Sequence, residues 1–438
     1  MLCGQFNAID KGYALGRLAM RLDQKTTSRQ AHHRTLSLFN TYIRHWKEPL
    51  HESTQSLLHG HQLAVECGDL EWGAYCLAAH IQFAFLQGKR LPDLQATFDE
   101  HIHWLRQSGQ KQSIQYSLIT LQVIDNLRHS RPHPTWLDGQ YYQEDFMLAE
   151  HRTENHKTAI CLHHFYKALL SYLFGEYQAA VRHCTSGEQL LPYIGGTYTY
   201  TFYLFIAALS RLALIPASPH KEHAQSLNNV AKILHRIQRW AKHCPRNHSH
   251  EASLIQAELC RIRKRDIQAM DLYDQAIGQA RDNDFPLVEA LACELAGKFY
   301  LSKNRPLFAN SYLEQARKGY QAYGAEAKYA HMHTTYPTVF NAAVQPPAPL
   351  ASPHGLSAPA LYSNQAIDIA SVIKASQAIS DEIVLERLLG RLIQLVIENV
   401  GAQRALLVLK RGLTANRCFS VAWHSMTAIS CRSNSLTT

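Results

Sequence analysis

The chain lacks a long, uninterrupted hydrophobic run, and this excludes most ways of crossing a membrane. The best candidate is Tyr198–Ile215, which is barely long enough, contains Arg211 and several hydroxyl side chains, and is followed by Pro216. We predict that it is a buried helix, and we expect no membrane partner. Met1–Met20 has neither the apolar core nor the cleavage pattern of a secretory leader. With ten cysteines at irregular intervals, the sequence therefore favours a cytoplasmic location.

The chain also lacks a concentrated basic patch. Its net charge is +9, but Lys and Arg are scattered among Asp and Glu. The densest cluster, Arg261 to Arg265, lies between two apolar-periodic segments and is more simply a solvated helix end. We therefore expect no nucleic-acid partner.

No recognisable catalytic motif is present. A phosphate-binding loop needs glycine followed by Lys and Ser or Thr, but Gly88-Lys89 precedes Arg90 and Gly297-Lys298 precedes Phe299. The motifs of a protein kinase are missing, and no histidine has the sequence context of a phosphoacceptor. We predict no catalytic residue, no cofactor-binding residue and no enzymatic activity.

Histidine is abundant, with 26 residues, yet its spacing does not predict a metal centre. None of the tightest groups has the paired-Cys or HExxH spacing that presents several ligands together. These groups are His163-His164, His331 with His333, and Cys244 with His248 and His250. Most cysteines lie on apolar-periodic segments, which favours core packing over reactivity, and the aromatic stretch Tyr193–Tyr203 is interpreted as packing. We predict no metal site.

Helical periodicity dominates residues 1–333. Gly68, Gly88 and Gly109 stand where helices are expected to end. The segment Lys167–Cys184 has the apolar, Gly, aromatic, Ala-Ala order of a tetratricopeptide-type hairpin, with Leu169, Tyr172 and Leu173 filling the groove between its helices and small residues at Ala179 and Ala180. LYDQAIGQA returns as YLEQARKGY, and the step from Gln275 to Gln315 is 40 residues, as in stacked helix pairs. We predict a tetratricopeptide-like helical solenoid over 1–333.

Residues 334–365 lack periodicity and are rich in Pro, Ala and Ser, so we predict a linker. A signalling helix is predicted over 366–383, where residues at mainly three- and four-residue steps, all apolar except Ser376, form a stripe able to pair with a second helix. The stripe comprises Ile369, Val372, Ile373, Ser376, Ile379 and Ile383. An amphipathic helix, a glycine stop at Gly401 and a short strand at Ala405–Leu409 are expected to follow.

The residues Asp368–Leu409, DIASVIKASQAISDEIVLERLLGRLIQLVIENVGAQRALLVL, resemble the beginning of a GAF domain in large bacterial multidomain signalling kinases. Those proteins join a serine/threonine-kinase-like domain, an AAA ATPase domain, a helical-repeat region, a GAF domain and a histidine kinase. Residues 39–76 and 250–332 resemble their helical-repeat region. The resemblance covers most of 1–410, and it implies a helical region followed by an incomplete GAF domain over 384–438. It assigns neither ATPase nor kinase activity to any residue here.

Residues 411–438 show no clean alternation, and a GAF domain needs further strands. We hypothesise that the reading frame or the gene is broken soon after Lys410; GAF-like sequence in another frame of the DNA would support this, and its absence would refute it. The elements that enclose a small ligand in complete GAF domains are missing, so no cofactor is expected.

The sequence thus predicts a mainly α chain with a truncated α/β end. Its expected role is that of a non-catalytic fragment of a sensor kinase, an interaction and relay scaffold that couples a GAF sensor to ATPase and kinase domains absent here. Its expected partners are proteins bound through the helical repeats and a second copy bound through the signalling helix. The alternatives are a stand-alone tetratricopeptide-like adaptor, whose concave groove suits extended partners, and an ATP-dependent enzyme subunit.

Overall fold

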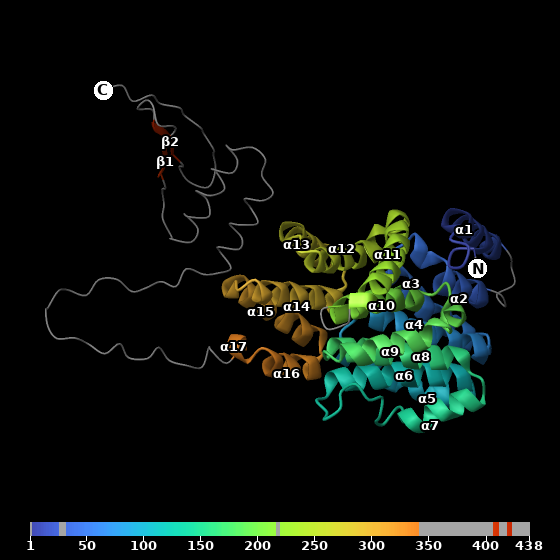
Figure 1. Cartoon of the computed structure of the whole chain (residues 1–438). Coiled ribbons are helices and arrows are strands. Elements are labelled where there is room, and N and C mark those ends of the chain that lie inside the picture. The colour runs from blue at the N-terminus through green and yellow to red at the C-terminus, as the bar shows by residue number, and fades with distance from the viewer. Residues whose placement is uncertain (1, 26–31, 216–219, 341–405, 411–417, 423–438) are drawn as a thin grey trace, which may run out of the picture. The chain divides into compact units, whose positions relative to one another are not determined.

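The chain is mainly α, as predicted (Figure 1). The computed structural model describes residues 2–25, 32–215 and 220–340, together with two strands at 406–410 and 418–422. The helices are α1 (Ile9–Lys25), α2 (His32–Tyr42), the 3₁₀ helix η1 (Arg44–Trp46), α3 (Leu50–Glu66), α4 (Leu70–Gln87), α5 (Leu91–Gln107), α6 (Lys111–Arg128), α7 (Glu144–Thr153), α8 (Lys157–Leu173), α9 (Tyr177–Glu188), the 3₁₀ helix η2 (Leu191–Ile194), α10 (Tyr198–Leu214), α11 (His220–His243), α12 (Pro245–Ile262), α13 (Asp266–Asp282), α14 (Pro286–Ser302), α15 (Pro306–Tyr323), α16 (Glu326–Thr335) and α17 (Pro337–Phe340).

The turns between helices recur at a nearly constant interval. Lys264, Asp284, Asn304 and Gly324 all have positive φ, and each lies 20 residues after the one before. The residue after each of them donates its backbone N–H to a carbonyl of the last helical turn, which satisfies one of the free carbonyls there. The same spacing, within one residue, relates Gly68, Gly88 and Gly109, and also Asn155, Gly175 and Gly196. Two such intervals make the 40-residue repeat seen in the sequence.

Consecutive helices pack as pairs, and the predicted pairs are present. Helices α8 and α9 form the hairpin predicted over 167–184, with Leu169, Tyr172, Leu173 and Ala180 all buried. Helices α12 with α13 and α14 with α15 form the two pairs related by the 40-residue step. These results confirm the helical-repeat prediction.

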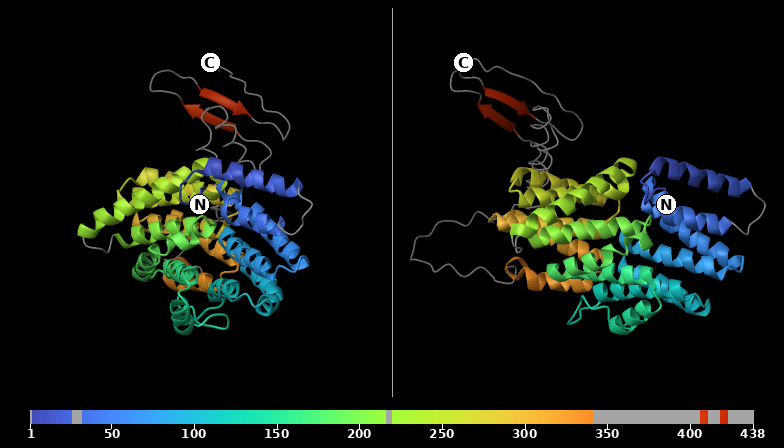
Figure 2. Two further views of the ribbon diagram at one scale, coloured as in Figure 1. Left: turned by 90° about the vertical axis from the view of Figure 1, so that its right-hand side faces the viewer. Right: turned by 45° about the vertical axis from the view of Figure 1, so that its right-hand side comes forward.

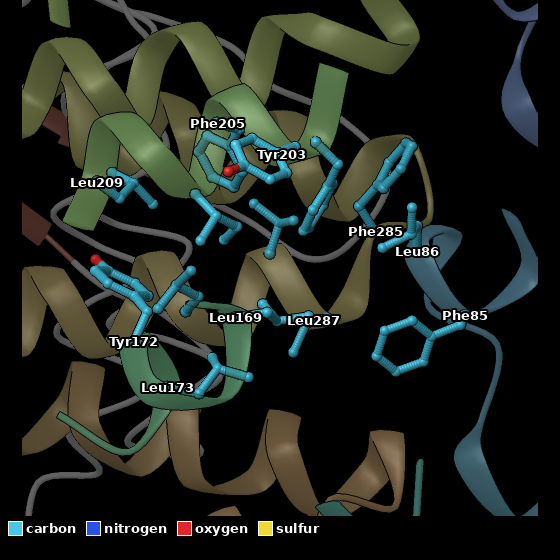
Figure 3. Packing of buried hydrophobic residues seen from close by; sticks show 14 of the residues in the cluster. Phe85, Leu86, Leu169, Tyr172, Leu173, Tyr203, Phe205, Leu209, Phe285 and Leu287 are labelled. Atoms are coloured by element: carbon cyan, nitrogen blue, oxygen red, sulfur yellow. The ribbon is translucent and has the colours of Figure 1, made fainter. Parts of the chain in front are cut away.

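The core lies between helices from distant parts of the chain. Helix α10 is buried around its whole circumference from Tyr198 to Leu212, which confirms the prediction of a buried helix. Figure 3 shows apolar side chains of α4, α8, α10 and α14 converging, among them Phe85, Leu169 and Phe205. Within the described residues, no helix is long and apolar enough to span a membrane.

The array turns back so that its two halves contact each other. Tyr323 Oη in α15 donates to the carbonyl of Phe85 in α4 at 3.2 Å, and Gly88, with φ +99°, lies against the ring of Pro286. Figures 1 and 2 show the orange C-terminal helices beside the blue-green helices of the first half. Asn247 makes a second long-range connection, because its side chain bonds the carbonyls of His45 and Glu48 and the amide of Leu50.

A buried charge cluster fastens α16 to the rest of the array. The Glu294 carboxylate in α14 accepts hydrogen bonds from Lys328 of α16 and from Tyr320 and Tyr336, at 2.9 to 3.1 Å. Lys328 also donates to the carbonyl of Leu173 at the end of α8. Burial lowers the pKa of Lys328 to about 8, while Lys298 and Lys328 hold the pKa of Glu294 well below its usual range, against the effect of burial.

The chain divides into a unit of residues 1–348 and a second unit of residues 349–438. In the second unit the structure describes β1 (Leu406–Lys410) and β2 (Cys418–Ala422), which pair antiparallel with Leu406 opposite Ala422. The first strand lies one residue from the predicted Ala405–Leu409. The second falls in 411–438, where we expected no regular pattern. In the first unit, helices α16 and α17 continue to Phe340, so residues 334–340, assigned to the linker from the sequence, are largely helical.

Candidate functional site

A groove crosses several helices in the first half of the array. Its lining comes from α2, α4, α6 and α8, from η2, and from the residue before α10, and it encloses a cavity of about 220 Å³. The lining residues are Ser37, Leu38, Thr41, Tyr42, Trp72, Tyr75, Ala78, Ala79, Gln82, Phe83, Tyr116, Thr158, Leu162, Tyr193, Ile194 and Thr197. We call this surface the aromatic groove.

Helix α4 forms the floor of the aromatic groove. Trp72, Tyr75, Ala79 and Gln82 follow at three- and four-residue steps, which place them on one face of the helix. The rings of Trp72 and Tyr75 meet edge to face with centroids 5.9 Å apart. The small side chains of Ala78 and Ala79 leave space beside these rings.

The walls of the groove carry further phenol and hydroxyl groups. Tyr42, at the end of α2, is 42% exposed, and Tyr193, in η2, is 56% exposed. Tyr116 of α6 forms a 2.9 Å hydrogen bond with His156, and burial raises its pKa to about 12, so its phenol stays protonated near neutral pH. The Thr158 hydroxyl donates to the Tyr193 carbonyl at 3.4 Å, which ties η2 to α8.

A second hollow continues the aromatic groove toward the N-terminus. It lies between α1 and α2, has a volume of about 460 Å³, and shares Leu38 and Tyr42 with the groove. Its floor is formed by Gly12, Gly16 and Ala19, whose small size lets α1 approach the N-terminal segment and α2 closely. The two hollows together form an extended surface across five helices.

No residue that lines either hollow is Asp, Glu, Lys or Arg, although these types make up 18% of the chain. The nearest charges lie around the aromatic rings. The Glu71 carboxylate accepts from the Tyr75 phenol at 3.2 Å, and the Arg34 guanidinium stands 5.8 Å from the centroid of the Trp72 ring. The lining itself therefore offers apolar faces and neutral hydrogen-bonding groups, and the adjacent Arg34 guanidinium is already bonded to the Asp69 carboxylate at 2.8 Å.

The residue types in the groove do not form a catalytic arrangement. Its lining contains no Cys, His, Asp, Glu or Lys that could act as nucleophile, acid or base. The described cysteines are free thiols, and Cys3, Cys76, Cys161, Cys184, Cys244 and Cys293 are buried, which confirms that most serve as core residues. The reactive groups in its lining are the hydroxyls of Ser, Thr and Tyr, and no acid or base side chain of the lining stands beside them.

Several members of the histidine groups noted in the sequence have other partners in the structure, whereas the ring nitrogens of His250 have no hydrogen-bond partner among the described residues. His248 pairs with buried Glu251 at 3.0 Å, and Cys244 Sγ faces the carbonyl of Glu48 at 3.5 Å. His164 lies 3.2 Å from His183, nitrogen to nitrogen. Across the described ranges, no group of three or more His, Cys, Asp or Glu side chains is arranged to hold a metal ion.

The basic cluster lies at the end of α12, where Arg263, Lys264 and Arg265 are exposed, as expected for a solvated helix end.

The six residues of the signalling-helix stripe lie outside the described residues, so the stripe remains a prediction. It comprises Ile369, Val372, Ile373, Ser376, Ile379 and Ile383.

Sequence reasoning missed the aromatic groove. The interpretation of Tyr193–Tyr203 as packing holds for Tyr198 to Tyr203, which are buried, but Tyr193 lines the groove and is exposed. The sequence signal that could have revealed the groove is the stripe of Trp72, Tyr75 and Ala79 on α4. Uncharged residues at this spacing are unusual on the solvent-facing side of a helix, which normally carries charged side chains.

Comparison with known proteins gives one partial relationship. No family model matches the chain. A stretch of 48 residues is 48% identical to hybrid signal transduction histidine kinase G of Dictyostelium discoideum. The stretch covers 11% of this chain and 1% of that protein, so the match spans a very small part of the relative. It supports a relationship to signalling histidine kinases over that stretch.

Proposed function

We propose that this chain is a non-catalytic interaction and relay scaffold of a cytoplasmic signalling kinase. In this role the tetratricopeptide-like helical array binds a protein partner, and the C-terminal part belongs to a GAF sensor. Kinase and ATPase domains would lie elsewhere in the same system. The partial similarity to a signal transduction histidine kinase supports the signalling context.

The observation that carries the proposal is the aromatic groove. It is lined by four helices of the repeat array and by η2, and its lining contains no Asp, Glu, Lys or Arg. Helical-repeat proteins use extended surfaces formed by successive repeats to hold their partners. Exposed Tyr and Trp side chains are also the residues most often found at the energetic centre of protein interfaces.

The relay part of the proposal rests on the predicted stripe from Ile369 to Ile383. A second copy of the chain would pair along this stripe, and polar Ser376 within it would allow two helix registers of similar energy. Sedimentation of the full-length chain tests this pairing. We expect a dimer at micromolar concentration and a monomer for the double variant Val372→Asp/Ile379→Asp, whereas a monomeric parent chain would refute the relay role.

Two further measurements separate this proposal from its alternatives. The first is ATP hydrolysis by the purified chain. Hydrolysis that persists after every step that removes contaminating ATPases would identify an enzyme subunit and overturn the non-catalytic assignment. An adaptor that works alone would bind its partners equally well after removal of residues 366–438. A relay should instead show partner binding that depends on those residues.

A further inference from the structure

The chemistry of the aromatic groove restricts what kind of segment it can hold. A charged side chain placed among its lining would lose hydration without gaining an unpaired opposite charge there, because neither hollow is lined by Asp, Glu, Lys or Arg and the adjacent Arg34 is already bonded to Asp69. The part of the partner that enters the groove must therefore be uncharged.

The aromatic rings that line the groove, of which Tyr42 and Tyr193 are exposed and Trp72 and Tyr75 half-buried, favour flat, rigid, apolar groups in a ligand. Trp72 and Tyr75 on α4 face the same hollow as Tyr42 on α2 and Tyr193 in η2. These four rings come from three different elements, so they present several separate platforms along the groove. Pyrrolidine rings fit such platforms, because aromatic-lined grooves hold successive turns of a polyproline II helix without ordering a flexible chain.

The hydrogen-bonding groups point to the same ligand. Among the described residues, the Tyr42 phenol, the Trp72 indole N–H and the Tyr193 phenol have no hydrogen-bond partner. One groove acceptor, Gln82 Oε1, is already engaged by Thr199 at 3.3 Å. The groove thus offers free donors. A polyproline II segment presents unpaired carbonyls, and its prolines bring no N–H group that would need an acceptor.

We propose that the aromatic groove binds an uncharged, proline-rich segment of a partner protein in the polyproline II conformation. The inference rests on the proposed function, since it names the partner class of the same surface. The proline rings pack between Trp72, Tyr75 and Tyr193, and the carbonyls accept from the indole and phenol donors. The hollow between α1 and α2 then receives the apolar residues that flank the proline run.

The test is a titration of the full-length chain against fluorescein-labelled decaproline, followed by fluorescence anisotropy. We expect saturable binding that Trp72→Ala and Tyr193→Ala each weaken tenfold or more, as expected for aromatic residues at the centre of an interface. Trp136→Ala is the matched control. Trp136 is 52% exposed and stacks on His133 in the loop between α6 and α7, outside the groove, so its removal should leave binding unchanged.

Two further peptides decide between outcomes. A decamer alternating Pro and Glu should bind at least tenfold more weakly than decaproline, because its carboxylates find no partner in the groove. A decamer of Leu, Ala and Ser without proline tests the class of ligand. If it binds through Trp72 and decaproline does not, the proline assignment is wrong while the interaction scaffold stands. If neither peptide binds, or if Trp136→Ala weakens binding as much as Trp72→Ala, both assignments fail at this groove.

Discussion

Buried neutral histidines should make the fold sensitive to mild acid. His45 and His250 are fully buried, His80 is 2% exposed, and burial lowers their pKa values to about 3, about 3 and about 4. In the unfolded chain each imidazole has an ordinary pKa of about 6.5. Below that pH the unfolded chain therefore binds protons that the folded chain does not, and stability is lost as the pH falls.

The size of the effect follows from proton linkage. Between pH 7.5 and pH 5.0, one histidine whose folded pKa is 4 or lower costs about 2 kcal/mol of unfolding free energy. The three buried histidines together cost about 6 kcal/mol, which is comparable with the whole stability of a typical domain. Glu251 and Asp274 act in the opposite direction, because burial raises their pKa values and their protonation favours the fold at low pH.

The assay is urea unfolding followed by circular dichroism at pH 7.5, 6.5, 5.5 and 5.0. The informative variant is His250→Phe, since both ring nitrogens of His250 lack a hydrogen-bond partner among the described residues and its ring packs on Phe285 with centroids 4.4 Å apart. Between pH 7.5 and pH 5.0, the unfolding free energy of this variant should fall by about 2 kcal/mol less than that of the parent chain.

The control is His103→Gln, at an exposed position of α5, which should leave the pH dependence unchanged. An unfolding free energy that stays constant within about 1 kcal/mol from pH 7.5 to 5.0 would refute the reasoning, given a predicted fall several times larger. Equal pH slopes for His250→Phe and the parent chain would refute the role of His250.

Three stability predictions follow from other parts of the fold, each measured by urea unfolding at pH 7.5. Glu294→Gln should cost about 3 to 5 kcal/mol, because it removes the carboxylate that compensates the buried ammonium of Lys328; a loss below 1 kcal/mol would contradict the charge cluster. Asn247→Leu should cost about 3 kcal/mol, since it breaks three hydrogen bonds that hold residues 45–50 to α12, and a neutral effect would show that this connection is dispensable. Lys264→Gly should stabilise the chain by up to about 1 kcal/mol, because glycine adopts the positive φ of 57° without strain. Gly324→Ala should destabilise the chain, because the new Cβ would lie 2.5 Å from Pro92. If both variants changed the unfolding free energy in the same direction, the account of the turns would be wrong.

Much of the helical architecture could be predicted from sequence because its determinants are local. Gly68, Gly88 and Gly109 end or follow helices in the structure, and the 40-residue step from Gln275 to Gln315 corresponds to two turn intervals. The continuous apolar character of Tyr198–Ile215 correctly indicated burial. Such features depend on the residues of one helix or one turn, so a single sequence contains them.

The groove and the closure of the array could not be predicted in this way. The groove exists only because α2, α4, α6, α8 and η2 converge, and nothing local to Tyr193 distinguishes it from its buried neighbours. The hydrogen bond from Lys328 to the carbonyl of Leu173 likewise joins helices that are 155 residues apart in the chain, so their contact depends on how the repeats between them pack. Helices α16 and α17 extend beyond the predicted boundary at 333, since tertiary contacts such as buried Tyr336 stabilise a short segment with weak periodicity.

The central claim is that the aromatic groove is the functional surface of this chain. Selection of random peptides displayed on phage, with the full-length chain and its Trp72→Ala variant as parallel baits, tests the claim most directly without assuming the partner. The account predicts that the parent chain enriches a family of peptides that the variant fails to enrich, with proline frequent and charge rare in their common segment. Enrichment of the same peptides by both baits, or of none by the parent chain, would contradict it.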